Sequence, residues 1–294
     1  MKDKLTVFLI NTLGALPIPV ARFLGCMTGT FMWLLPTRMK QVTRINIDLC
    51  FPDETPAWRR NLAKKSLIET SVTACEMAAC WIKPVSVVDS LIESIEGEHI
   101  LQEAQKLGKG VVLLAPHLGN WELLNFHLAT HYPMEIMYAP PKQQALDSLI
   151  LDARKRAGAK LVPASRRGVL SIFKHLKSGG ITGILPDQEP PLQSGVFAPF
   201  FGIKTLTPTL VSKLIKETNS VAVGVACFRQ KNGHFKLYLS KCHEAIYDSN
   251  VLVSAAALNR TIQDMILMHP EQYQWEYKRF KRRPDGEAKI YPKN

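Results

Sequence analysis

At 294 residues the chain is long enough for one large domain or two small ones, and its 46% hydrophobic residues can form a substantial core, which excludes a disordered chain. The formal charge of +12, from 37 lysine and arginine residues against 25 aspartate and glutamate residues, favours negatively charged partners such as nucleic acid, anionic lipid or acidic proteins. The 6 cysteines form no Cys-x-x-Cys pair, so neither a zinc ribbon nor a disulfide-rich secreted fold is expected.

The first segment, residues 5–35, is apolar apart from Arg22 and a few small polar residues, and Pro17 and Pro19 interrupt it. A membrane-spanning helix needs roughly 20 consecutive apolar residues, so one clean span is not expected. The pattern predicts a helical hairpin or an anchor lying in the plane of a membrane; a buried hairpin of a soluble protein is the alternative. No cleavage site for a signal peptide follows, so we expect the segment to be retained.

Basic residues flank the apolar segment, and they would meet anionic headgroups at the cytoplasmic face of a membrane. They are Lys2 and Lys4 on one side and Arg38, Lys40 and Arg44 on the other. We therefore predict a helical membrane-anchoring segment over residues 1–45. Residues 46–294 are predicted to form one domain, since no linker, internal repeat or low-complexity tract divides them.

Within that domain, helical periodicity over residues 56–82 predicts a long helix with a basic start. Short apolar strands then alternate with helices, which indicates an α/β fold with a mainly parallel central sheet flanked by helices. The predicted strands are 111–115, 134–138 and 181–185, and the helices that follow them are 121–129, 145–157 and 206–217. An antiparallel hairpin over 221–228 and 235–239 and a helix over 252–268 complete the prediction.

The most informative stretch is residues 111–122, in which a buried strand ends before Pro116 and a helix begins near Asn120. His117 falls in the turn between them, at the carboxyl end of a strand, where open α/β sheets bind their ligands. A histidine whose second nitrogen is held by a carboxylate can act as a general base near neutral pH. Glu122, five positions on, is the obvious carboxylate, and we expect the two side chains to converge.

The residues from His117 to Glu122 read His-Leu-Gly-Asn-Trp-Glu, which resembles the HxxxxD/E motif of lysophospholipid and glycerolipid acyltransferases. In particular they are similar to the H-x-G-N-W-E form of the late acyltransferases of bacterial lipid A biosynthesis. Three further blocks resemble that family in the same order along the chain. They are Arg-Lys-Arg-Ala-Gly at 154–158, Leu-Pro-Asp-Gln at 185–188 with Gly-Val-Phe-Ala-Pro-Phe-Phe-Gly at 195–202, and Gln-Tyr-Gln-Trp at 272–275 with Arg-Phe-Lys at 279–281.

The C-terminal block departs from the family pattern at two places. Lys278 stands where arginine is usual, so the positive charge is kept. Glu276 and Tyr277 replace the commoner pair of an apolar residue and a histidine. Any role of the usual histidine is therefore not transferred to this chain.

The resemblance implies a glycerolipid-acyltransferase-like fold, a catalytic domain over residues 46–294, and attachment to the cytoplasmic face of the inner membrane. It implies an acyl carrier protein as thioester donor and a phosphorylated glucosamine disaccharide lipid, of the Kdo-lipid IVA type, as acceptor. No cofactor, metal or nucleophilic serine is implied. The acceptor hydroxyl would attack the thioester directly while His117, assisted by Glu122, removes its proton.

Further site residues are expected from the same blocks, each with a structural alternative. Arg154 and Arg156 are candidates for phosphate or oxyanion contacts, or they lie on a solvated helix face. Asp187 and Gln188 follow a strand and are candidates for orienting an arginine or the sugar, or they form a turn. Arg279, in the basic run 278–283, would meet phosphates or the carrier protein, or be solvated. Phe197, Phe200 and Phe201 would wall an acyl-chain channel, or pack in the core.

Other chemistries fit the sequence less well. His127 and His131 lie four apart near Glu122, but the order is not His-Glu-x-x-His and a further ligand is missing, so no metal is expected. A serine hydrolase is disfavoured because the sequence contains no Gly-x-Ser-x-Gly elbow. A non-catalytic protein whose basic surface binds a membrane is the alternative class, and no nucleic-acid module is present. Within the enzyme class, the alternative acceptor is a lysophospholipid or mannoside lipid.

Overall fold

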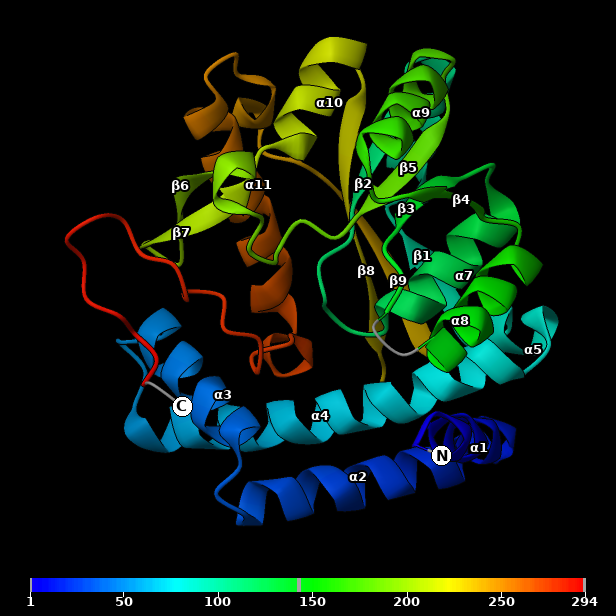
Figure 1. The fold of residues 1–294 in the computed structure, drawn as a ribbon, viewed down its shortest axis with the longest axis vertical. Coiled ribbons are helices and arrows are strands. Elements are labelled where there is room, and N and C mark those ends of the chain that lie inside the picture. Colours follow the sequence, from blue (N-terminus) through cyan, green and yellow to red (C-terminus); the bar gives the residue numbers. More distant parts are fainter. Residues whose placement is uncertain (1, 142–143, 293–294) are drawn as a thin grey trace.

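The computed structural model describes residues 2–141 and 144–292. Residue 1 of the predicted anchoring segment, residues 142, 143, 293 and 294 of the predicted catalytic domain, and the side chain of Lys2 lie outside the described residues. The chain opens with five helices that form the lower layer in Figure 1. They are α1 (Lys2–Ala15), α2 (Ile18–Leu34), α3 (Arg38–Cys50), α4 (Pro56–Ile82) and α5 (Val85–Asp89). The break between α1 and α2 falls at Pro17, as the prolines predict, and the predicted boundary at residues 45 and 46 falls inside α3.

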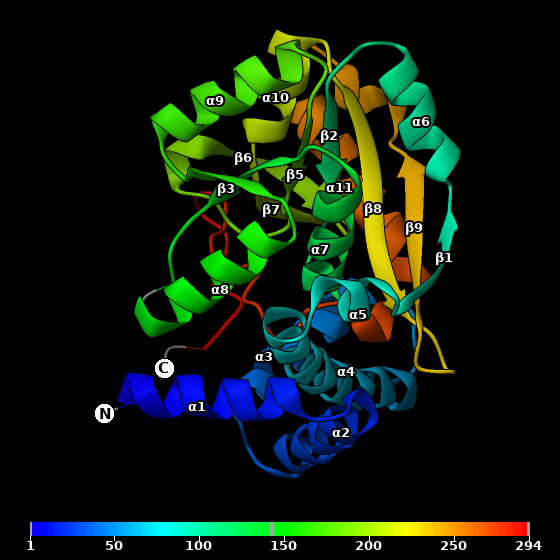
Figure 2. The same ribbon diagram turned by 90° about the vertical axis from the view of Figure 1, so that its right-hand side faces the viewer.

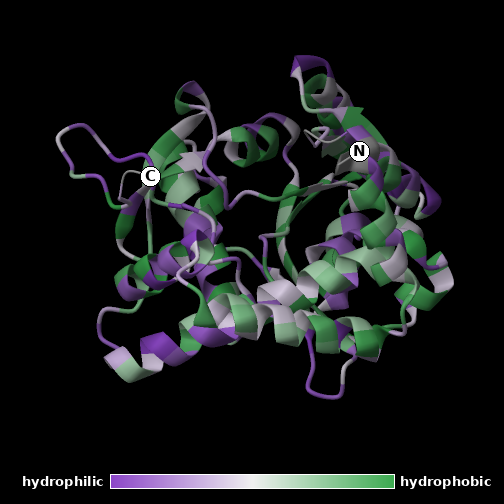
Figure 3. Ribbon diagram, turned by 60° about the horizontal axis from the view of Figure 1, so that its bottom comes forward, coloured by the Kyte–Doolittle hydropathy of each residue, from purple (hydrophilic) through white to green (hydrophobic). Residues whose placement is uncertain are grey.

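The helix α2 lies directly against α4. Gly25 and Gly29 allow this approach, because a Cβ atom at these positions would lie 2.7 Å from the Cα of Val72 and 2.5 Å from the Cα of Ile68. The opposite side of α2 presents large apolar side chains to the outside, with Phe23 63% and Phe31 61% exposed. Hydrophobic residues recur along the helices of this layer, which comes forward in Figure 3.

None of the described helices is by itself long and apolar enough to cross a membrane. The pair α2 and α3 meets the same length and hydropathy test only together, with a bend of 81° between its two members.

A five-stranded sheet in the order β1-β9-β8-β2-β5 stands above this layer. The pairs β1 with β9, β8 with β2, and β2 with β5 are parallel, and β8 with β9 is an antiparallel hairpin. The mixed α/β fold with a mainly parallel central sheet is thus confirmed. The strands are β1 (Ile92–Glu96), β2 (Val111–Leu114), β5 (Ile181–Ile184), β8 (Val221–Arg229) and β9 (Phe235–Lys241).

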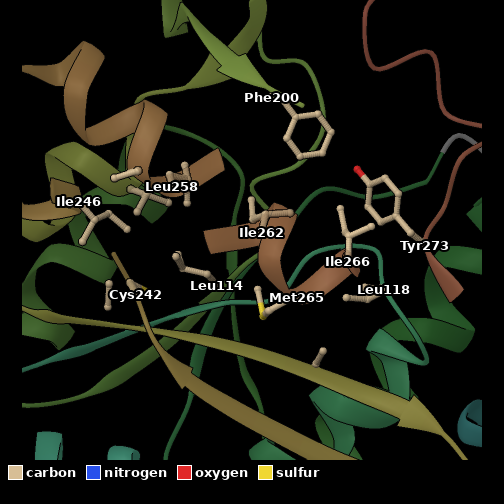
Figure 4. Close-up of a cluster of buried hydrophobic side chains, with 14 of the residues drawn as sticks. Leu114, Leu118, Phe200, Cys242, Ile246, Leu258, Ile262, Met265, Ile266 and Tyr273 are labelled. Carbon is tan, nitrogen blue, oxygen red and sulfur yellow. The ribbon is translucent and has the colours of Figure 1, made fainter. Parts of the chain in front are cut away.

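Helices cover both faces of the sheet, and successive residues of β2 alternate between two hydrophobic cores. Val112 and Leu114 lie in the core shared with α9 (Arg166–Lys177), α10 (Leu210–Thr218) and α11 (Val251–Met268), part of which Figure 4 shows. Val111 and Leu113 lie in the core shared with α6 (Glu98–Lys106), α7 (Trp121–His131) and α8 (Gln144–Arg156). Figure 2 shows the sheet between α9 and α10 on one side and α6 on the other.

Two small strand pairs lie outside the five-stranded sheet, and of their four strands only β3 was predicted, as the strand over 134–138. β3 (Glu135–Tyr138) and β4 (Lys160–Pro163) pair in parallel beside β5, and β6 (Gly195–Phe200) and β7 (Ile203–Pro208) form an antiparallel hairpin. The helix predicted over 206–217 therefore starts too early, since residues 206–208 belong to β7 and the helix begins at Leu210. The apolar and β-branched residues of β7 favour a strand, and β7 pairs with β6, which precedes it directly in the sequence.

Candidate active site

The turn that carries His117 is held against β8. It begins after Leu114, and Gly119 has a φ of 62°, in the left-handed region that favours glycine. A Cβ atom at Gly119 would lie 2.0 Å from the carbonyl oxygen of Cys227 in β8, so the close approach also requires glycine. The N–H of Asn120 donates to that same oxygen at 2.8 Å, and the side-chain oxygen of Asn120 caps α7 by accepting from the N–H of Leu123 at 2.9 Å.

The turn is hydrogen-bonded to a buried network of charged side chains centred on Glu76. The side-chain amide of Asn120 donates to Glu76 of α4 at 3.2 Å, and Glu76 is only 3% exposed. The same carboxylate accepts from Nε of Arg229 in β8 at 2.7 Å and from Nε of Arg22 in α2 at 2.6 Å. The carboxylate of Glu76 in α4 thus links α2 and β8 to Asn120, three residues after His117 in the same turn.

The imidazole of His117 is held by Asp187. Its Nδ1 lies 2.9 Å from Oδ1 of Asp187, and its backbone N–H donates to Oδ2 at the same distance. Asp187 follows β5, which pairs in parallel with β2, so the carboxyl ends of these two strands bring the residues together. Burial alone would raise the pKa of Asp187, but the charge of His117 and its two hydrogen bonds outweigh that and lower it.

Because Asp187 is an ionised acceptor, Nδ1 of His117 carries the proton and Nε2 presents its lone pair. The side-chain amide of Gln188 lies 3.2 Å from this Nε2 and donates also to Oε1 of Gln274 at 3.3 Å. The ring of Trp121 packs edge-on against the imidazole, with centroids 5.1 Å apart. The His117 side chain stays 15% exposed, so a ligand that displaces the Gln188 amide could reach Nε2.

Glu122 does not hold the imidazole, and in this respect the prediction was wrong. Its carboxylate, 1% exposed, accepts two hydrogen bonds from Arg154 of α8, from Nε at 3.0 Å and from a terminal nitrogen at 2.8 Å. Burial alone would lower the pKa of Arg154, but Glu122 raises it, so the arginine stays charged. The position of Glu122 in the first turn of α7 directs it toward α8, whereas Asp187 lies on the neighbouring strand end beside His117.

A cavity of about 870 Å³ is lined by five cationic side chains and by two carboxylates, those of Glu189 and Glu276. Glu189, the residue after Gln188, lines it and donates its backbone N–H to the hydroxyl of Tyr277, another lining residue, at 2.9 Å. The cationic lining residues are Arg38, Lys278, Lys281, Arg282 and Lys289. The excess of positive charge on this surface suits an anionic group of a ligand.

The family follows from comparison with known proteins. The profile of the family described as "Bacterial lipid A biosynthesis acyltransferase" matches residues 2–282. The chain belongs to this family. Among its relatives, the lipid A biosynthesis palmitoleoyltransferase of Escherichia coli is 27% identical over 278 residues, which cover 94% of this chain and 90% of that protein.

Two other relatives match over similar lengths. The lipid A biosynthesis lauroyltransferase of Escherichia coli is 26% identical over 280 residues, with 94% of this chain and 90% of that protein covered. A lipid A biosynthesis acyltransferase of Haemophilus influenzae is 27% identical over 290 residues, with 96% and 88% covered. The prediction of a lipid A acyltransferase is therefore confirmed at the level of the family.

Two of the arginines expected at the site make their hydrogen bonds to backbone oxygens of other elements, although the charge of Arg279 still contributes to the lowered pKa of Asp187. Arg156 is exposed and donates to the backbone oxygen of Trp81 at the end of α4. Arg279 is only 2% exposed and donates to the carbonyl of Leu206 in β7 at 2.7 Å, with its guanidinium over the ring of Phe200. Arg279 is thus enclosed by protein in this structure; the cations next to it in the sequence, Lys278 and Lys281, line the basic cavity instead.

The aromatic block of the acyltransferase does not form one exposed wall. Phe200 is 1% exposed and lies in the core near Tyr273, where Figure 4 shows it. Phe201 is half-buried between Phe51 and Trp275, with ring centroids 5.4 Å and 5.8 Å away. Phe197 is half-buried in β6. Phe200 therefore has the packing role that was the alternative to an acyl channel, because its position in β6 points it into the core.

Sequence reasoning selected Asp187 and Gln188 as site residues but did not predict that both contact His117. The signal that could have found the role of Asp187 was present, since two predicted parallel strands end just before His117 and Asp187. Parallel neighbours place their carboxyl ends together, so these residues had to be close if β2 and β5 are adjacent. No pattern in the sequence reveals that adjacency, because strand order depends on how the helices pack.

Proposed function

We propose that the protein transfers a fatty acyl chain from acyl carrier protein to a hydroxyl of a phosphorylated glucosamine disaccharide lipid of the Kdo-lipid IVA type. The observation that carries this proposal is the contact of Asp187 with Nδ1 of His117, which leaves Nε2 as a proton acceptor. The names of the relatives, which are lipid A palmitoleoyl and lauroyl transferases, support the substrate class.

The proposed reaction uses His117 as general base. Its Nε2 takes the proton of the acceptor hydroxyl while that oxygen attacks the thioester carbon; the carbon–sulfur bond then breaks, and the proton goes to the leaving thiolate. Asp187 fixes the tautomer of His117 and stabilises the imidazolium that forms. Glu122 and Arg154 act as a positioning pair that holds α8 against the first turn of α7, next to the reacting group.

The basic cavity supports a phosphorylated acceptor and an acidic donor. Five cationic side chains, against the two carboxylates of Glu189 and Glu276, line about 870 Å³, and this excess of positive charge suits the phosphates of the lipid. Arg156, which donates to the backbone oxygen of Trp81, and Arg279, which is only 2% exposed, do not line the cavity and are left out of the proposed contacts. Gln188 would bind the acceptor hydroxyl or the thioester oxygen in place of its present contact with His117.

We further propose that residues 1–45 attach the enzyme to the cytoplasmic face of the inner membrane. The exposed apolar side chains of α1 and α2, such as Phe8 and Phe31, support this location, since an outward face of this kind is typical of helices lying in a bilayer surface. A membrane location would also present a lipid acceptor to the cavity without requiring the lipid to leave the bilayer.

The function is tested by incubating the purified protein with acyl carrier proteins of several chain lengths and phosphorylated lipid A precursors, followed by mass spectrometry of the lipid. We expect one added acyl group with the wild type and none with His117→Ala, which should still bind vesicles. Acylation of a lysophospholipid or mannoside in place of the lipid A precursors would overturn the proposed acceptor. Full activity of the alanine variant would overturn the mechanism.

A further inference from the structure

A second cluster of titratable side chains lies away from His117, where α5 ends next to the last turns of α7. Asp89, the last residue of α5, places one carboxylate oxygen 2.6 Å from Nδ1 of His127 and the other 3.0 Å from Nε2 of His131. The two imidazole rings lie 4.4 Å apart between centroids. Residues 127 and 131 share a face of α7 because they are four apart on a helix.

These three side chains match the ligand preferences of a divalent transition metal. Imidazole nitrogen and carboxylate oxygen are the usual ligands of Zn²⁺, at roughly 2.0–2.2 Å, which places neighbouring ligand atoms about 3.3 Å apart. One ligand atom from each of the three residues lies within 4.8 Å of the others, the only such group among the described residues.

One side of the cluster faces solvent, so a metal bound there could keep one coordination position open for water. The side chain of His127 is 9% exposed and that of Asp89 27%, whereas His131 is 47% exposed and faces solvent. Either ring nitrogen of a neutral histidine can present a lone pair to a metal when the proton is on the other nitrogen.

We propose that Asp89, His127 and His131 form a binding site for a divalent transition-metal ion of the Zn²⁺ type, with water as the fourth ligand. The ion would join the end of α5 to α7, the helix whose first turn carries Glu122. The site is separate from the groups assigned to acyl transfer, so it does not depend on the proposed function. The sequence pattern of His127 and His131 lacked a third ligand, and the fold supplies it from a residue 38 positions earlier.

Tag-free protein, stripped with a chelator and dialysed, should be titrated with ZnCl₂ by calorimetry and unfolded thermally with and without the ion. We expect one Zn²⁺ per chain and a higher Tm with Zn²⁺, since an ion that binds only the folded state stabilises it. MgCl₂ at the same concentration should have no effect, because Mg²⁺ requires oxygen ligands.

His131→Gln removes one ligand at a half-exposed position and should fold normally, which its metal-free Tm checks. We expect its Zn²⁺ affinity to fall by at least about tenfold. His243→Gln is the matched control, since His243 pairs with Asp264 at 2.7 Å in a similar exposed contact outside the cluster, and its affinity should stay unchanged. No Zn²⁺-dependent rise in Tm for the wild type, or the same rise for His131→Gln, would show that the cluster is only a hydrogen-bonded triad.

Discussion

At the scale of single residues, the environments of the two carboxylates near His117 separate their roles. Asp187 contacts both the imidazole ring and the backbone N–H of His117, whereas the carboxylate of Glu122 accepts its two hydrogen bonds from the guanidinium of Arg154. A carboxylate that contacts the base affects the rate of proton transfer, and one that holds a helix affects mainly stability. The amide variants of the two residues should therefore differ.

Asp187→Asn should lower kcat for acyl transfer by about 100-fold or more, which is typical for the loss of a general base in its correct tautomer. An asparagine side chain can donate to Nδ1 and so stabilise the wrong tautomer of His117. Initial rates measured by mass spectrometry of the lipid product, with the far-ultraviolet circular dichroism spectrum as a check on folding, test this. A rate within about threefold of the wild type would remove Asp187 from the mechanism.

Glu122→Gln provides the comparison. We expect this substitution to lower the free energy of unfolding by roughly 2–3 kcal/mol. The expected loss is toward the low end for a broken buried ion pair, because the side chain of Arg154 is 20% exposed. Urea denaturation of the variant and the wild type measures this. If the variant is as stable as the wild type but inactive, Glu122 acts on the chemistry directly.

The lowered pKa of Asp187 also predicts a dependence of stability on pH. A folded pKa below the unfolded value of about 3.9 means that the unfolded state binds more protons, so the carboxylate stabilises the fold above that pH. This contribution is lost as the pH falls through the folded pKa. As the pH falls below about 5, the free energy of unfolding should therefore decrease more steeply for the wild type than for Asp187→Asn; parallel curves would contradict the lowered pKa of Asp187.

At the scale of elements, the turn between β2 and α7 depends on glycine for two separate reasons. Gly119 has a positive φ and also lies against the carbonyl of Cys227, whereas Gly108 has a similar φ of 63° with no atom within 4 Å of a Cβ. Comparing substitutions at Gly119 and Gly108 therefore separates the free-energy cost of a positive φ from the cost of the steric clash with β8.

Gly119→Ala should destabilise the protein by about 2–4 kcal/mol, since strain in φ adds to a clash with backbone. Gly108→Ala should cost only about 1 kcal/mol, from the φ strain alone. Chemical denaturation measures both variants. Because the turn carries His117, we also expect Gly119→Ala to lose activity at temperatures where it remains folded. Equal destabilisation by the two substitutions would mean that the contact with β8 is not tight.

At the scale of the whole molecule, the apolar residues of the described chain are distributed unevenly. Many of the exposed large ones lie on α1 and α2, on the side away from α4, while the sheet and its helices enclose two cores. Figure 1 shows these helices at one side of the molecule, below α4. That arrangement is the basis for the proposed attachment to a membrane surface.

Phe31→Glu, at a position 61% exposed, should weaken binding to vesicles containing anionic lipid, because a carboxylate at this surface opposes insertion and is repelled by the headgroups. Leu107→Glu is the matched control, since Leu107 is 65% exposed at the end of α6, away from the N-terminal helices. Co-sedimentation with vesicles measures both. If both variants bind as the wild type does, α2 does not contact the membrane.

The sequence by itself determined the α/β class, the break at Pro17, the β8–β9 hairpin and the position of His117 after β2, because these depend on periodicity and on residues adjacent in the chain. Only the tertiary structure decided which carboxylate meets His117, that Arg279 is enclosed, and that Asp89 joins His127 and His131. Each of these contacts joins residues from different elements. They depend on strand order and helix packing, which no local pattern encodes.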